Sequence, residues 1–133
     1  MAQPTLSLFT GDETFGTIFS EQNQIIAKFV DTTVPFSSTT SKINLGVLGN
    51  ARIIVLQGAT DGTGWTGATV DARIKDFIDT METWINISGG QTSKTYTDSF
   101  GDTYTVYAFD FTWQRTNSDP GRISYSLLMK EGI

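Results

Sequence analysis

The sequence contains no cysteine and no histidine among its 133 residues. Without cysteine, the chain has no disulfide, no thiolate nucleophile and no cysteine-ligated metal. Without histidine, it lacks the commonest general base and the commonest metal ligand. Catalysis would have to rely on carboxylates, lysines or hydroxyls alone. We therefore predict that the chain is not an enzyme and needs no cofactor or metal.

Long apolar runs are also missing. No stretch approaches the roughly 18 apolar residues that cross a membrane, and Met1–Thr5 lacks the basic and then apolar order of a signal peptide. We therefore expect no membrane anchor.

Charge is sparse as well. Only 17% of residues are charged, the net charge is -5 and the pI is about 4.4. The nine Lys and Arg residues are scattered, whereas phosphate binding needs clustered cations. We predict no specific binding of nucleic acid, although an acidic wall would keep passing DNA from adhering.

The residues that are abundant favour β-structure. Thr, Ser and Gly are frequent and aromatics reach 12%, a balance that suits strands and turns and is not that of a disordered chain. A length of 133 residues suits one domain with a moderate core. We predict a single domain over residues 1–133.

The first half of the chain predicts several strands. Weak strand patterns cover 5–9, 15–19 and 24–30, the last also compatible with a short helix. The polar stretch 31–42, interrupted by Pro35, predicts an extended loop. Strands at 43–47 and 52–57 then flank 48–51, which has the composition of a tight turn, so we predict a hairpin there. The β-branched run 52–57 is the strongest strand pattern in the chain.

A glycine-rich segment follows at 58–67. Gly62, Gly64 and Gly67 have the G-x-G-x-x-G spacing of a dinucleotide-binding turn, between a strand and a helix. That fingerprint belongs to a parallel βαβ unit, but the pattern after this helix is antiparallel. The bulky Trp65 also lies inside the turn. Nucleotide binding is therefore the weaker interpretation.

Val70–Ile87 predicts the one clear helix. Apolar residues recur at helical spacing and form one stripe: Val70, Ile74, Phe77, Ile78, Met81 and Ile85. Thr69 is a suitable N-cap, and the glycines at 89 and 90 end the pattern.

Three runs after the helix, at 92–100, 103–115 and 122–130, predict an antiparallel meander. Alternation places four aromatics of the middle run on one face (Tyr107, Phe109, Phe111 and Trp113) and four apolar residues of the last run on one face (Ile123, Tyr125, Leu127 and Met129). We predict that these two rows pack against the helix stripe. Tyr104, Val106 and Ala108 have the opposite parity, so either both faces are covered or a bulge shifts the register.

Two kinds of site remain as alternatives to a structural role. Asp110, between two phenylalanines in a strong strand, is the carboxylate least explained by a turn, although an outward position in an alternating strand explains it as well. Four aromatics could form a platform for sugar stacking: Trp65, Tyr96, Tyr104 and Trp113. A small carbohydrate- or ligand-binding β-module is therefore the alternative function.

The order of elements resembles the tail-tube and distal-tail fold of tailed bacteriophages, which contractile injection systems share. The resemblance rests on the strand within Gly49–Gly58, on the helix Val70–Ile87, and on the closing strands Tyr104–Trp113 and Asp119–Glu131. Together these pieces span about residues 43–133. No stacking hairpin is evident in the sequence.

The resemblance implies a mainly β, α+β fold: an antiparallel sandwich or barrel with one flanking amphipathic helix. It also implies a structural virion protein, made in the host cytoplasm, that closes into rings, usually hexamers, around a DNA channel and contacts other tail proteins. A tail-tip adhesin, an adaptor ring or a tail-completion protein are alternatives. The residues we expect at a subunit or ring interface are Val34, Pro35, Phe36, Ser37 and Trp65.

Overall fold

The computed structural model describes residues 3–33, 42–86, 91–116 and 118–132, and for 27–33 and 42–51 it describes the backbone alone. The elements in chain order are β1 (Thr5–Leu6), β2 (Thr17–Thr33), β3 (Lys42–Thr60), α1 (Val70–Ile85), β4 (Lys94–Thr97), β5 (Thr103–Thr116) and β6 (Asp119–Glu131).

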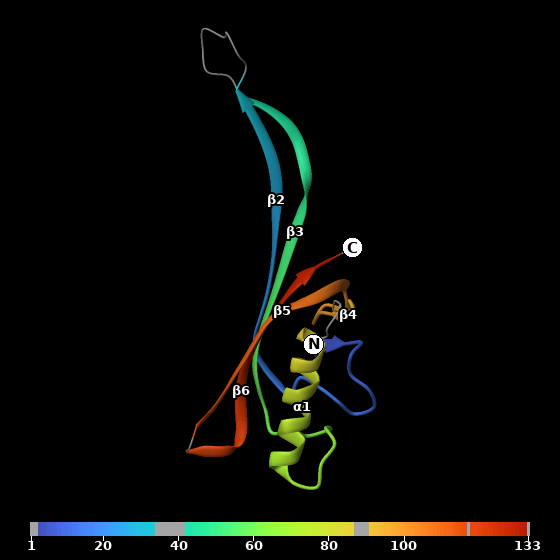
Figure 1. Ribbon diagram of the computed structural model, residues 1–133, viewed down its shortest axis with the longest axis vertical. Coiled ribbons are helices and arrows are strands. Elements are labelled where there is room, and N and C mark those ends of the chain that lie inside the picture. The colour runs from blue at the N-terminus through green and yellow to red at the C-terminus, as the bar shows by residue number, and fades with distance from the viewer. Residues whose placement is uncertain (1–2, 34–41, 87–90, 117, 133) are drawn as a thin grey trace.

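The described strands form one antiparallel sheet of six, in the order β1-β4-β5-β6-β3-β2. Figure 1 shows the sheet with α1 against one of its faces, while β2 and β3 run on together far past the other strands. The predicted class, mainly β with one flanking helix, is confirmed. The predicted meander after the helix is confirmed as β4, β5 and β6.

The first half of the sheet differs from the prediction. β3 runs unbroken through 48–51, where Gly49 pairs with Lys28 and Asn50 with Ala27, so the hairpin predicted between 43–47 and 52–57 is wrong. β2 and β3 instead pair with each other along a long hairpin. Of the stretch 31–42, which the sequence predicts as a loop, residues 31–33 and Lys42 are strand. Residues 34–41 lie outside the described part.

α1 begins where the sequence predicts. The Thr69 hydroxyl accepts a hydrogen bond from the Ala72 amide at 3.1 Å, a standard N-cap. The helix ends at Ile85, with Asn86 as its C-cap. Its buried face comprises Ile74, Phe77, Ile78, Met81 and Trp84. In the described part of the chain, no helix is long and apolar enough to cross a membrane.

The core lies between α1 and the sheet. Ile123, Tyr125, Leu127 and Met129 of β6 are all buried against it, as predicted. Phe77 is at the centre: its ring lies 5.2 Å from Trp65, 5.9 Å from Phe111 and 5.0 Å from Tyr125, centroid to centroid. The helix stripe therefore packs on the β5–β6 hairpin.

β5 changes face partway along. Val106 and Ala108 are buried, and the register with β6 then shifts between Ala108 and Asp110. After this bulge, Phe111 faces the core while Phe109 is 61% exposed. The prediction that Tyr107, Phe109, Phe111 and Trp113 share the core-facing side is therefore wrong. The bulge, which the sequence left open as an alternative, explains the change of parity.

Candidate assembly interface

Besides the two-residue β1 at the far end of the sheet and the part of β3 that extends past β6, two strands have an edge with no backbone partner among the described residues. β2 is the last strand of the sheet and pairs only with β3. β5 pairs with β4 only from Thr103 to Val106. Beyond that, the Gln91 side chain bonds the backbone of Ala108, and 109–116 has an open edge. Unpaired strand edges are templates for pairing with another chain.

Exposed hydrophobic side chains are concentrated on these two strands. The described residues include seven large hydrophobics on the surface, and five belong to β2 or β5: Phe19 (63% exposed), Ile25 (53%), Ile26 (41%), Phe109 (61%) and Trp113 (46%). An exposed apolar side chain beside an open strand edge increases the tendency of that edge to associate with another chain. The combination makes both edges candidate contact surfaces.

Irregularities in the strands expose two of these aromatics. Phe19 lies at a register shift between Ile18 and Ser20, and Phe109 at the bulge in β5. The Lys130 ammonium lies 3.9 Å from the centre of the Phe109 ring, a cation–π contact that leaves the outer side of the ring uncovered. Sequence reasoning missed both residues. The sequence signal for their exposure was that apolar residues occupy both odd and even positions of the same strand, so that they cannot all face the core.

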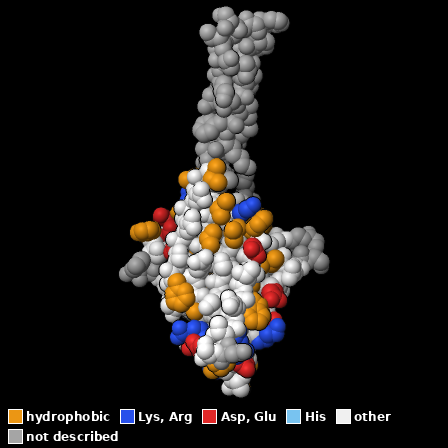
Figure 2. All heavy atoms as spheres, turned by 90° about the vertical axis from the view of Figure 1, so that its left-hand side faces the viewer, with side chains coloured by type: hydrophobic (Ala, Val, Ile, Leu, Met, Phe, Trp, Pro, Cys, Tyr) orange, Lys and Arg blue, Asp and Glu red, His pale blue; other side chains and the backbone are white. Residues whose placement is uncertain are grey.

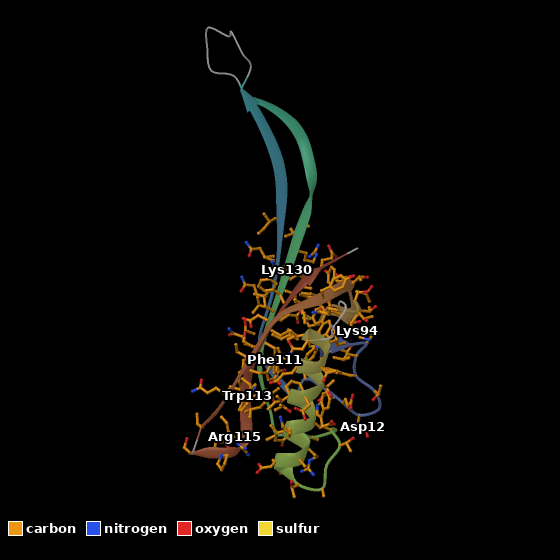
Figure 3. All side chains as sticks on the ribbon, in the orientation of Figure 1. Asp12, Lys94, Phe111, Trp113, Arg115 and Lys130 are labelled. Carbon is orange, nitrogen blue, oxygen red and sulfur yellow. The ribbon has the colours of Figure 1, made fainter. Side chains whose placement is uncertain are left out.

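Trp113 of β5, labelled in Figure 3, lines a hollow beside the open edge of that strand. The hollow measures about 490 Å³ and its apolar walls are Ile74 and Ile78 of α1 and Ile123 of β6. The ion pair between Arg115 and Asp71 lies at its rim. An apolar recess next to an open strand can receive a side chain from a neighbouring molecule.

The long hairpin is anchored to the body by Arg52. Its guanidinium donates to the Asn23 side chain at 2.7 Å, lies 3.7 Å from the Glu131 carboxylate and covers the Tyr104 ring at 4.5 Å. These partners come from β2, β6 and β5. The anchor lies where β3 loses its pairing with β6, which ends at Ile53, so it fixes the direction in which the hairpin leaves the sheet.

Of the five residues predicted for the interface, the structure describes only Trp65. Val34, Pro35, Phe36 and Ser37 lie outside the described residues, and their role stays a prediction. Trp65 is 4% exposed, and its indole N–H donates to the Thr14 carbonyl at 3.0 Å. Its ring offers almost no surface to a second copy, so burial gives no support to an interface role.

The glycine-rich segment is shaped by packing against the chain itself. A Cβ at Gly62 would lie 2.6 Å from the Arg73 Cβ, and one at Gly67 would lie 2.7 Å from the Ala72 Cβ. Both glycines therefore let the segment approach the first turn of α1. Asp61 accepts from the amide and hydroxyl of Thr63, and these bonds lower the pKa of its carboxyl. The spacing reflects close packing, not a phosphate cradle.

The other candidate sites do not assemble. Asp110 is exposed on β5, and no group of three or more acidic side chains placed to hold a metal occurs among the described residues. Of the four aromatics proposed as a platform, Trp65 and Tyr96 are buried in the core, while Tyr104 lies under Arg52. The structure does not bring them together as one stacking surface.

Comparison with known proteins identifies the fold. No family model and no curated protein sequence matches the chain. Among solved structures, a chain from the tail of an empty GTA particle, refined helically with C6 symmetry, is 19% identical with a TM-score of 0.54, covering 91% of this chain and 81% of its own length.

A chain from the virion of a native gene transfer agent (GTA) particle is 17% identical with a TM-score of 0.54, covering 91% of this chain and 84% of its own. The chain therefore has the fold of proteins that build phage-like tails, as its sequence predicts.

Proposed function

We propose that this chain is a structural protein of a phage-like tail, whose copies join side by side through β2 and β5 into a closed ring. The observation that carries the proposal is the concentration of exposed hydrophobics on the two open-edged strands. A closed ring pairs every such edge. The fold shared with chains of GTA tails supports the same function.

Strand direction favours this joint. Neighbouring strands are antiparallel throughout, so β5 and β3 run one way while β6 and β2 run the other. Rotation about an axis along the strands preserves these directions. The β2 edge of one copy would therefore meet the β5 edge of the next in antiparallel orientation, and the sheet would continue across the joint.

The dimensions of a six-copy ring favour the face of the sheet opposite α1 as the channel lining. Six copies, as in the C6 neighbour, with four long strands each would give a barrel of about 24 strands and roughly 50 Å between opposing backbones. Helices inside would occupy roughly 30 Å of that width. We therefore place α1 outside and the opposite face of the sheet around a channel wide enough for DNA.

The long hairpin would join one ring to the next. Its paired part beyond the body, about nine residues per strand from Ile25 onward, is about 30 Å long. It can reach a neighbouring ring, with Val34, Pro35, Phe36 and Ser37 at the contact. Stacked rings make a tube, which explains the extension better than a single adaptor ring does. Other tail proteins would meet the ends of the tube in the assembled virion.

Native mass spectrometry and negative-stain microscopy test the proposal. Wild type is expected to form rings, with a six-fold species, or tubes. Phe19→Asp and Phe109→Asp each place a charge at a joint and should leave monomers with an unchanged circular dichroism spectrum. Phe100→Asp is the matched control, because Phe100 is 87% exposed but lies on the β4–β5 turn. A wild type that stays monomeric at high concentration, or a control that disperses as readily, would contradict the joint.

A further inference from the structure

The face of the sheet opposite α1 has an unusual charge distribution. In β6, Ile123, Tyr125, Leu127 and Met129 point to the core, so the alternate residues point away. Their register partners on β2, β3 and β5 point the same way. Four rows result, headed by Ser124, Ser126, Leu128 and Lys130, and we call them the outer face. Figure 2 views the molecule from this side.

Two of the four rows consist of uncharged polar groups and small residues. The row of Ser126 holds Thr112, Gln57 and Ser20, and the row of Ser124 holds Gln114, Thr17 and Ala59, of which Ala59 is buried. The other two rows, toward the hairpin, are more apolar: they comprise Asp110, Leu128, Val55 and Gln22, then Tyr107, Lys130, Ile53 and Gln24.

The four rows therefore carry one carboxylate, Asp110, and one ammonium, Lys130, and their net charge is zero. The exposed Phe109 ring lies against that ammonium, so it borders the same face as well as the β5 edge. In Figure 2 the centre of the outer face is white and orange, and the red and blue side chains lie mainly toward its margins and lower end. Arg122, near the start of β6, pairs with Asp119 at 3.9 Å.

Most acidic side chains of the described residues lie elsewhere. α1 carries Asp71, Asp76, Asp79 and Glu82 against two cations, Arg73 and Lys75. Asp12, Glu13 and Asp61 lie in loops outside the four rows. The sequence-based expectation that the acidic balance would face passing DNA therefore has no counterpart on this face.

We infer that the channel is lined by an electrically neutral surface of hydroxyl, amide and apolar groups, and that it fits a duplex nucleic acid in transit by offering it neither ion pairs nor repulsion. This inference rests on the proposed function, which places the outer face inside the ring. Opposite charges in adjacent rows cancel within a Debye length, roughly 8 Å at physiological ionic strength. Phosphates would find no cation cluster to hold them, and the passage of the duplex would depend little on salt.

Single-cysteine chemistry tests the inference, because the natural chain has no cysteine. Ser126→Cys places a thiol at the centre of the outer face. Thr83→Cys places one on the exposed side of α1, next to Glu82. Both variants are assembled into tubes and treated with a cationic and an anionic methanethiosulfonate of similar size. For each thiol we take the rate with the cationic reagent divided by the rate with the anionic reagent. This ratio, normalised to the same ratio for a small free thiol, reports the local electrostatic potential.

For Ser126→Cys in tubes we expect a normalised ratio within about threefold of one, since a potential of a few kT would change it by more than about tenfold. Thr83→Cys should favour the cationic reagent. Adding Thr112→Glu to Ser126→Cys should raise the ratio, which shows that the thiol senses the lining. A preference of about tenfold or more at Ser126→Cys for either reagent would overturn the neutral lining.

Location is tested with a maleimide on a 5-kDa polyethylene glycol. In tubes, Ser126→Cys should be protected from it and Thr83→Cys should react, while both react in dissociated monomers. Equal reaction in tubes would put the outer face outside, which overturns the inference while the ring proposal stands. If no rings or tubes form, the proposed function fails, and the inference fails with it.

Discussion

Replacing Phe77 with alanine tests the core on which the interface is built. Phe77 is fully buried, and its ring contacts three others, those of Trp65, Phe111 and Tyr125. Truncating a buried phenylalanine costs about 3–5 kcal/mol, and aromatic pairs contribute about 0.5–1.5 kcal/mol each beyond their buried area. Three such pairs place the expected loss at the upper end, about 4–5 kcal/mol.

Urea unfolding of the unassembled monomer, followed by tryptophan fluorescence and circular dichroism, measures this loss. The m-value should stay unchanged. The free energy of unfolding of a domain is about 5–15 kcal/mol in total, so the alanine variant could fail to fold. Phe77→Leu should cost less stability because it leaves a smaller cavity, and it can be measured in that case. Val70→Ala is the matched control on the same helix, because Val70 is 37% exposed. A loss below about 1 kcal/mol for Phe77→Ala would refute the packing described.

Three further outcomes are expected. Gly62→Ala should cost about 1–3 kcal/mol more in urea than Gly101→Ala, because both have positive φ but only Gly62 faces a close neighbour; equal losses would refute the close approach. Burial raises the pKa of Tyr125, so its contribution to stability is fully present below pH ~10 and is lost as pH rises above that value; an unfolding midpoint in urea that is flat above pH 10 would contradict this. Arg52→Ala should speed amide exchange in β2 around Asn23 while α1 keeps its protection; unchanged exchange there would mean that the hairpin needs no anchor.

The sequence predicted the elements whose side chains meet the core. α1 was predictable because its stripe repeats at 3.6 residues and Thr69 caps it. β6 was predictable because it keeps strict alternation from Ile123 to Met129. In both cases one face is buried along most of the patterned stretch, from Ile74 to Trp84 in α1 and from Ile123 to Met129 in β6, and burial selects the residue types.

The long hairpin was not predictable on the same grounds. Residues 25–33 of β2 and 42–52 of β3 pair only with each other. No core face therefore imposes alternation of apolar and polar residues on them. Gly49 and Asn50 have the composition of a turn, yet they lie within a continuous strand. The bulge in β5 likewise depends on which residues β6 presents opposite it. Sequence patterns therefore left the register open, and with it the exposure of Phe109.

β3 belongs to the body and to the extension without a break. Eight of its residues, Ile53 to Thr60, are paired with β6, and the rest continue outward with β2 alone. A pull on the far end of the extension is therefore transmitted along one covalent strand into the molecule. Such a force acts parallel to the strands, so it loads all eight β3–β6 residue pairs at the same time and does not separate them one by one. The extension and the core should consequently yield in a single mechanical event.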